Sequence, residues 1–479
     1  MNAPQWFGLR FIDIATGEGI PMIVVETLDR AIHVSDNHGW IALPASTEER
    51  WHAVRADGYA LPADGFGFRG LPLRAKAGGR RTVPLTRTQV ARRISRLTGH
   101  EQEIDSRRLG LVSSTNLDAF DGIVGMDSAQ TVAHRGKRLW FWGDTTVSGY
   151  PLGNFRTSGA VASLPRGAIT AANPPRLRVV RASDGRPAPM VPGREPGMVW
   201  ISGLVECGTG STARCLAYYS RMRDLGTRLE HGHVEWDESR KCFRIRSRID
   251  DLDSWRHLEG HPIRFTDSGT WIAGGFTFPN TRVRDSVEAI LRPDRWEAFT
   301  CLDENGKVQR KNGKVVHRWT RAAKPLEPRA ELDLIRNGVI KAEDAWYLPV
   351  GPDGNVIVPH GGSVAWNPWR SRWIAVFTRL GGSPSKFGEV WYAESPHPVG
   401  PWRKAVRVAE HVDHSFYNPV LHPFLDRDGG RIIHFEGTYS EQFADHPKPV
   451  PRYEYNQILY ALDLSDSRLK RASTEDSDE

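Results

Sequence analysis

Between residues 118 and 464 the chain repeats one pattern: a short apolar strand, a glycine or polar turn, and a second strand rich in aromatic residues. The pattern occurs in residues 122–145, 197–220, 255–276, 360–382 and 415–440. Most copies are followed by another strand pair, as in "GHVEWDESRKCFRIRS". Each unit therefore predicts a four-stranded sheet, and five in series predict an all-β fold with a five-bladed β-propeller over residues 118–464. A large β-sandwich is the alternative, but it does not explain why inner and outer hairpins recur together.

The segments outside this repeat have other patterns. Residues 1–85 alternate apolar and polar positions over short runs, which predicts a small N-terminal β-sandwich of the regulatory or carbohydrate-module kind. Residues 86–117 are predicted to be a helical linker, because Val90, Ile94 and Leu97 would share one helix face. Residues 465–479 are polar and acidic and predict a disordered tail. The 46 Gly and 32 Pro fit a turn-rich β protein.

Charge and cysteine content exclude several classes of protein. The net charge is +7, but Lys and Arg are spread along the chain, so binding to nucleic acid is not indicated. The four Cys show no metal-binding spacing and predict free thiols in a reducing compartment. There is no run of about 18 apolar residues and no basic, apolar leader, so we expect a cytoplasmic protein without a membrane partner. Secretion of a processed form stays open, and the sequence does not indicate an oligomeric state.

The five hairpins predict one functional face. In a propeller, the start of each inner strand and the end of its partner strand converge on one funnel. Aligning the hairpins by their turns places Asp127, Ser202, Glu259, Ser363 (preceded by His360) and Asn418 at the five starts. Second-strand ends add Asp144 and Glu436. Two carboxyl groups facing each other across a funnel are what glycoside hydrolysis needs, one to activate water and one to protonate the leaving oxygen.

Three short stretches carry a resemblance to a known family. "MDSAQTVAHRGKRLWFWGD", "LEGHPIRFTDSGTWIAG" and "SPHPVGPW" resemble segments of the five-bladed glycoside hydrolases of the arabinanase and β-xylosidase type, glycoside hydrolase family 43. The resemblance implies a carbohydrate substrate, an inverting mechanism and no organic cofactor. It also implies that Asp127 is the general base and Glu259 the general acid.

One departure from that family leaves the activity open. The resembled enzymes have an Asp that opens the second blade and tunes the pKa of the acid, whereas "MVWISGL" has none. Asp144 or Glu436 could take this role. The alternatives are an oligosaccharide phosphorylase on the same fold and a non-catalytic glycan-binding propeller. For each carboxylate, turn capping or a surface ion pair is the structural alternative.

Other side chains are candidates for substrate or ion binding. Trp142 and Trp366 could stack on sugars or simply fill the core, and His360, Asn418 and Arg370 are further substrate-binding candidates. The resemblance implies an axial calcium or sodium ion, for which His422 is the predicted ligand. Alternatively, His422 is a structural histidine whose ring nitrogens are hydrogen-bonded within the fold.

Overall fold

The computed structural model describes residues 5–112, 119–149, 156–192, 196–382, 385–450 and 452–472. The protein is all-β, as predicted, with only short helices: α1 (Ile104–Arg108), α2 (Val287–Ile290) and α3 (Pro328–Arg336). No helix in these ranges is long and apolar enough to cross a membrane. Cys207, Cys215, Cys242 and Cys301 are free thiols, as expected.

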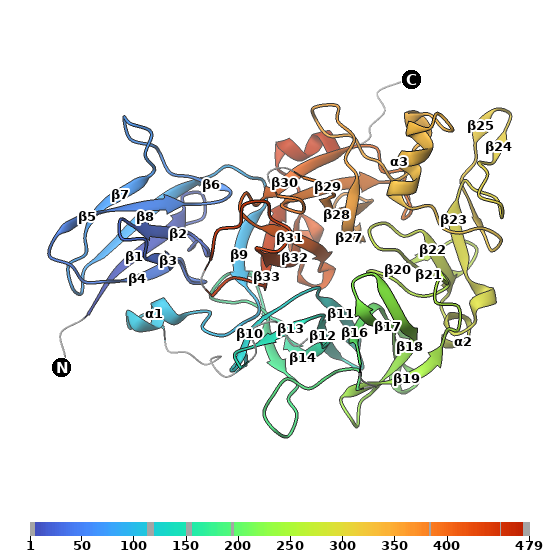
Figure 1. The fold of residues 1–479 in the computed structure, drawn as a ribbon, viewed down its shortest axis with the longest axis horizontal. Coiled ribbons are helices and arrows are strands. Elements are labelled where there is room, and N and C mark those ends of the chain that lie inside the picture. Colours follow the sequence, from blue (N-terminus) through green and yellow to red (C-terminus); the bar gives the residue numbers. More distant parts are fainter. Residues whose placement is uncertain are drawn as a thin grey trace.

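The N-terminal region contains two four-stranded sheets (Figure 1). The first consists of β4 (Trp40–Pro44), β1 (Trp6–Asp13), β8 (Arg80–Arg87) and β6 (Tyr59–Ala60). The second consists of β3 (Ile32–Val34), β2 (Val24–Thr27), β5 (Glu49–Arg55) and β7 (Gly70–Arg74). Side chains from both sheets, such as Phe11 and Val25, form one buried cluster, because alternate residues of each strand point to the same side.

Five further sheets follow in chain order, and each begins with one of the predicted hairpins. The first sheet has β11 (Gln130–His134), β12 (Lys137–Trp142), β14 (Ser158–Ser163) and β15 (Arg176–Val179). The second has β16 (Met198–Cys207), β17 (Arg214–Asp224), β18 (Thr227–Asp237) and β19 (Cys242–Arg248). The third has β20 (Ile263–Thr266), β21 (Thr270–Gly274), β22 (Thr281–Arg284), β23 (Glu297–Thr300) and β26 (Arg318–Thr320).

The last two sheets complete the series around a common centre (Figure 1). The fourth has β27 (Pro359–Asn367), β28 (Arg372–Arg379), β29 (Glu389–Ser395) and β30 (Ala405–Glu410). The fifth has β31 (Ser415–Leu421), β32 (Ile432–Ser440), β33 (Asn456–Asp463) and β9 (Arg92–Arg96). There are also two separate two-stranded sheets. One pairs β10 (Ile123–Met126) with β13 (Thr145–Val147), and the other pairs β24 (Arg310–Lys311) with β25 (Lys314–Val315).

The predicted helix in the first part of the 86–117 linker is wrong. Residues 92–96 are instead the strand β9, which pairs with β33 and forms the edge of the fifth sheet. Helical spacing of apolar residues was misleading here, since Val90 and Ile94 pack into different core clusters. Pairing with a distant strand decides the local structure, which is the usual way that tertiary contacts override local propensity. Only the short α1 is helical in the described part of the predicted linker.

The predicted disordered tail is also wrong over residues 467–472. This segment forms a 3-10 helix that packs against β29 and β30 of the fourth sheet, and its Leu469 and Ala472 are fully buried in a core cluster. The spacing of three residues places both side chains on one face of the turn. Residues 473–479 lie outside the described residues.

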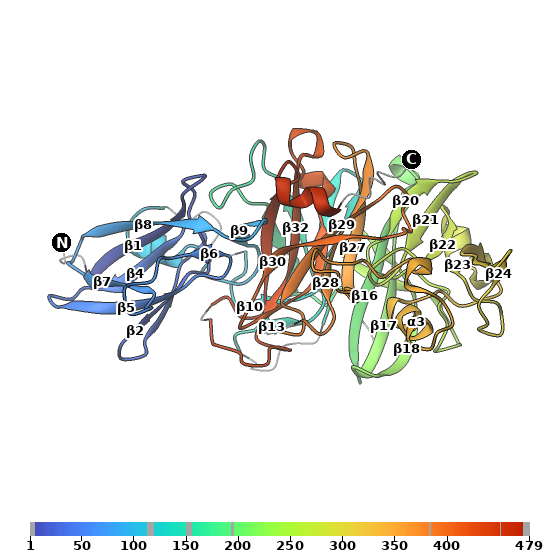
Figure 2. The same ribbon diagram turned by 90° about the horizontal axis from the view of Figure 1, so that it is seen from above.

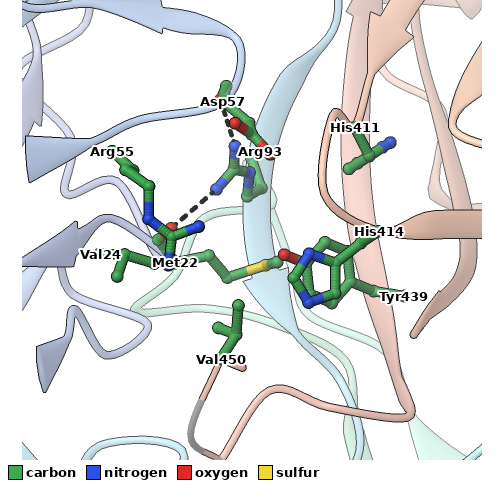
Figure 3. A pocket seen from close by; sticks show the side chains of 9 residues that line it. All are labelled: Met22, Val24, Arg55, Asp57, Arg93, His411, His414, Tyr439 and Val450. Carbon is green, nitrogen blue, oxygen red and sulfur yellow. Dashed lines mark hydrogen bonds between the residues drawn. The ribbon is translucent and has the colours of Figure 1, made fainter. Parts of the chain in front are cut away.

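The two-sheet N-terminal region lies beside the fifth sheet (Figures 1 and 2). Arg93 of β9 crosses this boundary, because its guanidinium donates to the Pro21 carbonyl oxygen at 2.9 Å. It also donates to the carbonyl oxygen of Asp57 (Figure 3). Its side chain is almost fully buried. His414 and Tyr439 lie on the other side of the small pocket in Figure 3, with their rings stacked 4.3 Å apart.

Candidate active site

In each of the five sheets, one residue of the left-handed region lies within the first strand or up to three residues before it. These residues are Ser128, Gly203, Gly260, Gly361 and Asn418, with φ between 40° and 61°. In the second, fourth and fifth sheets the strand pairing shifts register at this point, as in a β-bulge. The residues just before them are therefore equivalent. They are Asp127, Ser202, Glu259, His360 and Tyr417.

Contacts between neighbouring sheets place these positions at one end of the five first strands. Asn418 Nδ2 donates to Ser128 Oγ at 2.8 Å. A Cβ on Gly361 would lie only 2.5 Å from Asn418 Oδ1, so the backbones of the fourth and fifth sheets approach closely there. The Gly203 N–H donates to the Gly260 carbonyl oxygen at 2.9 Å, which links the second and third sheets. Asp127 and Glu259 therefore stand at the same end of the central region.

Asp127 is held by several donors. Its Oδ1 accepts from the Asp144 N–H at 2.7 Å, and its Oδ2 accepts from the Tyr417 hydroxyl at 3.1 Å. The Tyr455 hydroxyl is a further partner. Burial, and next the charge of Asp144, raises the pKa of Asp127 to about 7. The carboxyl group therefore exchanges its proton near neutral pH.

Asp144 is the carboxyl neighbour of Asp127. Trp200 Nε1 donates to Asp144 Oδ1 at 2.6 Å, and burial raises the pKa of Asp144 as well. Because two close carboxyl groups disfavour double ionisation, Asp127 and Asp144 titrate as a pair. The Asp144 side chain thus acts on Asp127, the candidate base.

Glycines explain how Glu259 is placed. The Glu259 carbonyl accepts from the Gly275 N–H at 3.2 Å, and Gly260 bridges to Gly275. A Cβ on Gly260 would lie 2.0 Å from the Gly275 carbonyl oxygen, and one on Gly274 would lie 2.6 Å from that of Glu259. Only glycine allows this approach, so Gly260 and the Gly274-Gly275 pair fix the backbone that carries Glu259.

The surroundings of the Glu259 side chain favour its protonated form. Burial raises the pKa of Glu259, and Arg228 opposes this in part. Glu327, the residue before α3, accepts from Asn280 Nδ2 at 2.6 Å. Burial and the charge of Glu259 raise the pKa of Glu327 to about 7. The charge of Glu259 therefore influences the ionisation of Glu327.

A row of aromatic rings ends at Tyr417, whose hydroxyl donates to Asp127. Starting from the residue after Gly275, ring contacts run through Phe276, His360, Phe387, Phe443 and Tyr417, with centroids 4.4 to 5.7 Å apart. Phe276 and Phe443 are exposed, so part of this aromatic wall faces solvent. Burial lowers the pKa of His360 to about 4, so its imidazole is neutral at pH 7. Flat apolar rings beside hydrogen-bonding carboxyl groups suit a sugar ring.

Other predicted residues lie elsewhere. Trp142 and Glu436 are buried, with Glu436 Oε1 2.9 Å from Trp140 Nε1 and 3.2 Å from His422 Nε2. Trp366 and Arg370 lie at the turn between β27 and β28, the opposite end from His360. Arg370 pairs there with Glu394 at 3.1 Å. Of the predicted set, Asp127, Asp144, Glu259, His360 and Asn418 share one end of the sheets.

Sequence reasoning missed five residues that contact or influence these carboxyl groups: Trp200, Arg228, Glu327, Tyr417 and Tyr455. Tyr417 could have been found, because it immediately precedes Asn418, which was already a candidate. Glu327 had no signal, since it precedes a helix that lies outside the repeated hairpins.

The described residues contain no group of three or more His, Cys, Asp or Glu side chains arranged to hold a metal ion. His422 is fully buried and its ring packs 4.8 Å from that of Trp140. Its nearest carboxyl group is that of Glu436.

Comparison with known proteins gives a distant structural similarity. No family model and no curated protein matches the chain. Its structure is similar to a family 43 glycoside hydrolase from Bacillus licheniformis (12% identity, 70% of this chain and 71% of that chain, TM-score 0.36). It is also similar to an endo-1,5-α-L-arabinanase from Thermotoga petrophila (13% identity, 70% of each chain, TM-score 0.34). A family 43 enzyme from Xanthomonas citri has 11% identity over 71% of this chain and 87% of that chain, at a TM-score of 0.35.

Proposed function

We propose that this protein is a glycoside hydrolase in which Asp127 is the general base and Glu259 the general acid. The observation that carries the proposal is the position of these two carboxyl groups. Both precede the left-handed residue of a first strand, at the same end of the sheets, and the aromatic wall runs from Phe276 to Tyr417, the donor to Asp127. A sugar could lie on this wall with one carboxyl group on each side of its glycosidic bond.

The two groups need opposite protonation states, and their surroundings supply them. Glu259 must carry a proton, and burial favours the protonated form of its carboxyl group. Asp127 must be ionised, which its pKa of about 7 allows at neutral and higher pH. The Tyr417 hydroxyl and the Asp144 N–H donate to Asp127 and would hold it while it takes a proton from water.

We also propose that the reaction inverts the anomeric centre. An inverting enzyme needs room for a water molecule between base and sugar, and its carboxyl groups are about 6.5–9.5 Å apart. Asp127 and Glu259 come from the first and third sheets, with the second sheet between them in chain order. No organic cofactor is needed for this chemistry.

The proposed architecture is a five-bladed β-propeller with a preceding β-sandwich. The sheets that begin with β11, β16, β20, β27 and β31 would be the blades, and β9 would close the fifth blade. The two N-terminal sheets around one core would be the sandwich, over about the predicted residues 1–85. Support comes from the five equivalent left-handed residues and from a central cavity that the first strands of all five sheets line.

In the resembled family an Asp opens the second blade and tunes the acid. Ser202 occupies the equivalent position in this chain. We propose that Glu327 takes over the role of that Asp in tuning the acid, because Glu327 is the carboxyl group that the charge of Glu259 influences. Asn280 fixes Glu327 and lies next to the Gly274-Gly275 turn, whose Gly274 carbonyl accepts from the Asn280 N–H at 2.9 Å. Glu436, in contrast, contacts Trp140 and His422.

The test is hydrolysis of a panel of aryl glycosides and of plant and bacterial polysaccharides, with and without phosphate. Turnover by the wild type, lost in Asp127→Asn and kept in Asp250→Asn, is the expected result; Asp250 is an exposed carboxylate just beyond β19. Proton NMR of the first product anomer reports inversion. Strict dependence on phosphate would favour a phosphorylase, and glycan binding without turnover would favour a binding protein.

A further inference from the structure

A cavity of about 330 Å³ lies at the centre of the five sheets. The first strands β11, β16, β20, β27 and β31 all contribute to its walls, with Thr131, Leu204, Ile263, Val364 and Val420 among them. This volume is at the lower end of the range for small-molecule sites. The cavity therefore has room for about one or two sugar rings.

The cavity extends along the first strands, from Leu204 and His261 beside the left-handed glycines to a rim at the hairpin-turn end, and this rim lies away from the candidate active site. Arg138, Arg264, Trp366 and Trp373 line it, and each lies within a few residues of the turn that joins the first two strands of its sheet. Asp127 precedes β11, whereas Arg138 follows the turn after β11. A strand rises about 3.3 Å per residue, so the two ends are separated by roughly 20 Å.

Arg138 is the unusual residue at this rim. Its guanidinium lies over the ring of Phe424, 3.8 Å from the ring centre. Among the described residues its guanidinium, which carries five N–H donors, makes no hydrogen bond or ion pair. Burial lowers the pKa of Arg138, with Glu206 opposing, but an arginine stays charged at pH 7. The neighbouring Arg264, in contrast, pairs with Asp285 at 2.8 Å.

Trp366 supplies a flat apolar surface at the same rim. Its side chain is 47% exposed, and its ring packs edge-on against that of Trp373, with centroids 5.7 Å apart. Gln130 and Thr131 add polar groups to the wall, and burial lowers the pKa of His261 to about 3, so that this histidine adds no positive charge.

We propose that the turn-end rim of this cavity is a second, non-catalytic binding site for a uronic acid, a sugar that carries a carboxylate. The planar fork of Arg138 would hold the carboxylate with two parallel hydrogen bonds, and the sugar ring would lie on Trp366. Arg138 forms no ion pair in the part of the chain that the structure describes, and the nearby negative charge of Glu206 disfavours a dianion, so a single carboxylate suits the site better than a doubly charged phosphate. This site does not depend on the proposed hydrolase activity.

The test is isothermal titration of the wild type with galacturonate and glucuronate, compared with galactose, glucose and acetate. We expect both uronates to bind in the millimolar range and each matched neutral sugar and acetate at least ten-fold more weakly. A trigalacturonate arm reports whether a chain binds more tightly than the free acid. Failure of both uronates and the trimer to bind, or equal binding of uronate and neutral sugar, would overturn the proposal.

Matched variants locate the binding. Arg138→Gln and Trp366→Ala should each weaken uronate binding at least ten-fold, whereas Arg138→Lys should weaken it less, because it keeps the charge and loses the fork. Trp369→Ala and Arg372→Gln are the controls, since both residues flank the same turn and do not line the cavity. Circular dichroism and thermal melting check that each variant is folded. Unchanged uronate binding by a folded Arg138→Gln variant would contradict the assignment, whether or not any glycoside is hydrolysed.

Discussion

At the scale of single residues, the raised pKa of Asp127 makes the folded protein less stable at neutral pH than at acidic pH. Its pKa in the folded protein is about 7, above the value of about 3.9 for an unfolded aspartate. Between these values the folded state binds more protons than the unfolded state, so stability falls as the pH rises from about 4 to 7.

Asp127→Asn should remove this pH-dependent loss. We expect the stability of the variant relative to the wild type to be about 4 kcal/mol greater at pH 8 than near pH 4, because a shift of about three pKa units is removed, as measured by urea unfolding at both pH values. An equal difference in unfolding free energy at the two pH values would mean that the folded pKa of Asp127 is not raised.

Asp144 should control the pH at which Asp127 becomes a base. Asp144→Asn removes a negative charge beside Asp127 and keeps an amide oxygen to accept from Trp200 Nε1. The pKa of Asp127 should fall by roughly one unit, so the acidic limb of the kcat/KM profile should move to lower pH. Glu436→Gln is the comparison variant, because Glu436 contacts Trp140 and His422 instead of Asp127, and it should leave that limb unmoved.

At the scale of elements, the turn after β21 positions Glu259 through glycines. Gly260→Ala would bring a methyl group to 2.0 Å from the Gly275 carbonyl at a left-handed position. We expect a loss of about 3 kcal/mol or more in unfolding free energy and more than ten-fold in kcat/KM, because the backbone must move. Gly136→Ala, in the β11–β12 turn, shares a positive φ but meets no atom within 4 Å, and should cost only about 1 kcal/mol.

Hairpins were predictable from the sequence, whereas distant pairings were not. Alternating apolar residues and a glycine turn specify a unit such as β16–β17 locally. The partner of β9 is β33, and only the folded chain brings these strands together. The site shows the same division. Asp127 and Glu259 follow from the repeat, but Tyr455 and Glu327 reach them from segments that carry no repeat signal.

At the scale of the whole molecule, Arg93 joins the N-terminal region to the fifth sheet (Figure 3). Arg93→Met keeps an apolar stem but leaves the carbonyls of Pro21 and Asp57 without this donor. We expect the free energy of the first unfolding transition to fall by about 2–4 kcal/mol and protease cleavage near residues 88–91 to become faster. Arg81→Met is the control, because Arg81 is an exposed arginine that donates to Pro72 within the N-terminal region. Equal stability of the two variants would show that Arg93 does not hold the parts together.

The central claim is that Asp127 and Glu259 act as base and acid on one glycosidic bond. The most direct measurement compares kcat/KM of Glu259→Gln and Asp127→Asn on an unactivated oligosaccharide and on the matching dinitrophenyl glycoside. Glu259→Gln should lose roughly 10²–10⁴-fold on the oligosaccharide and much less on the activated substrate, whose leaving group needs little protonation. Asp127→Asn should lose activity on both, because water must be activated in either case. Wild-type activity of Glu259→Gln on the unactivated oligosaccharide would contradict the account.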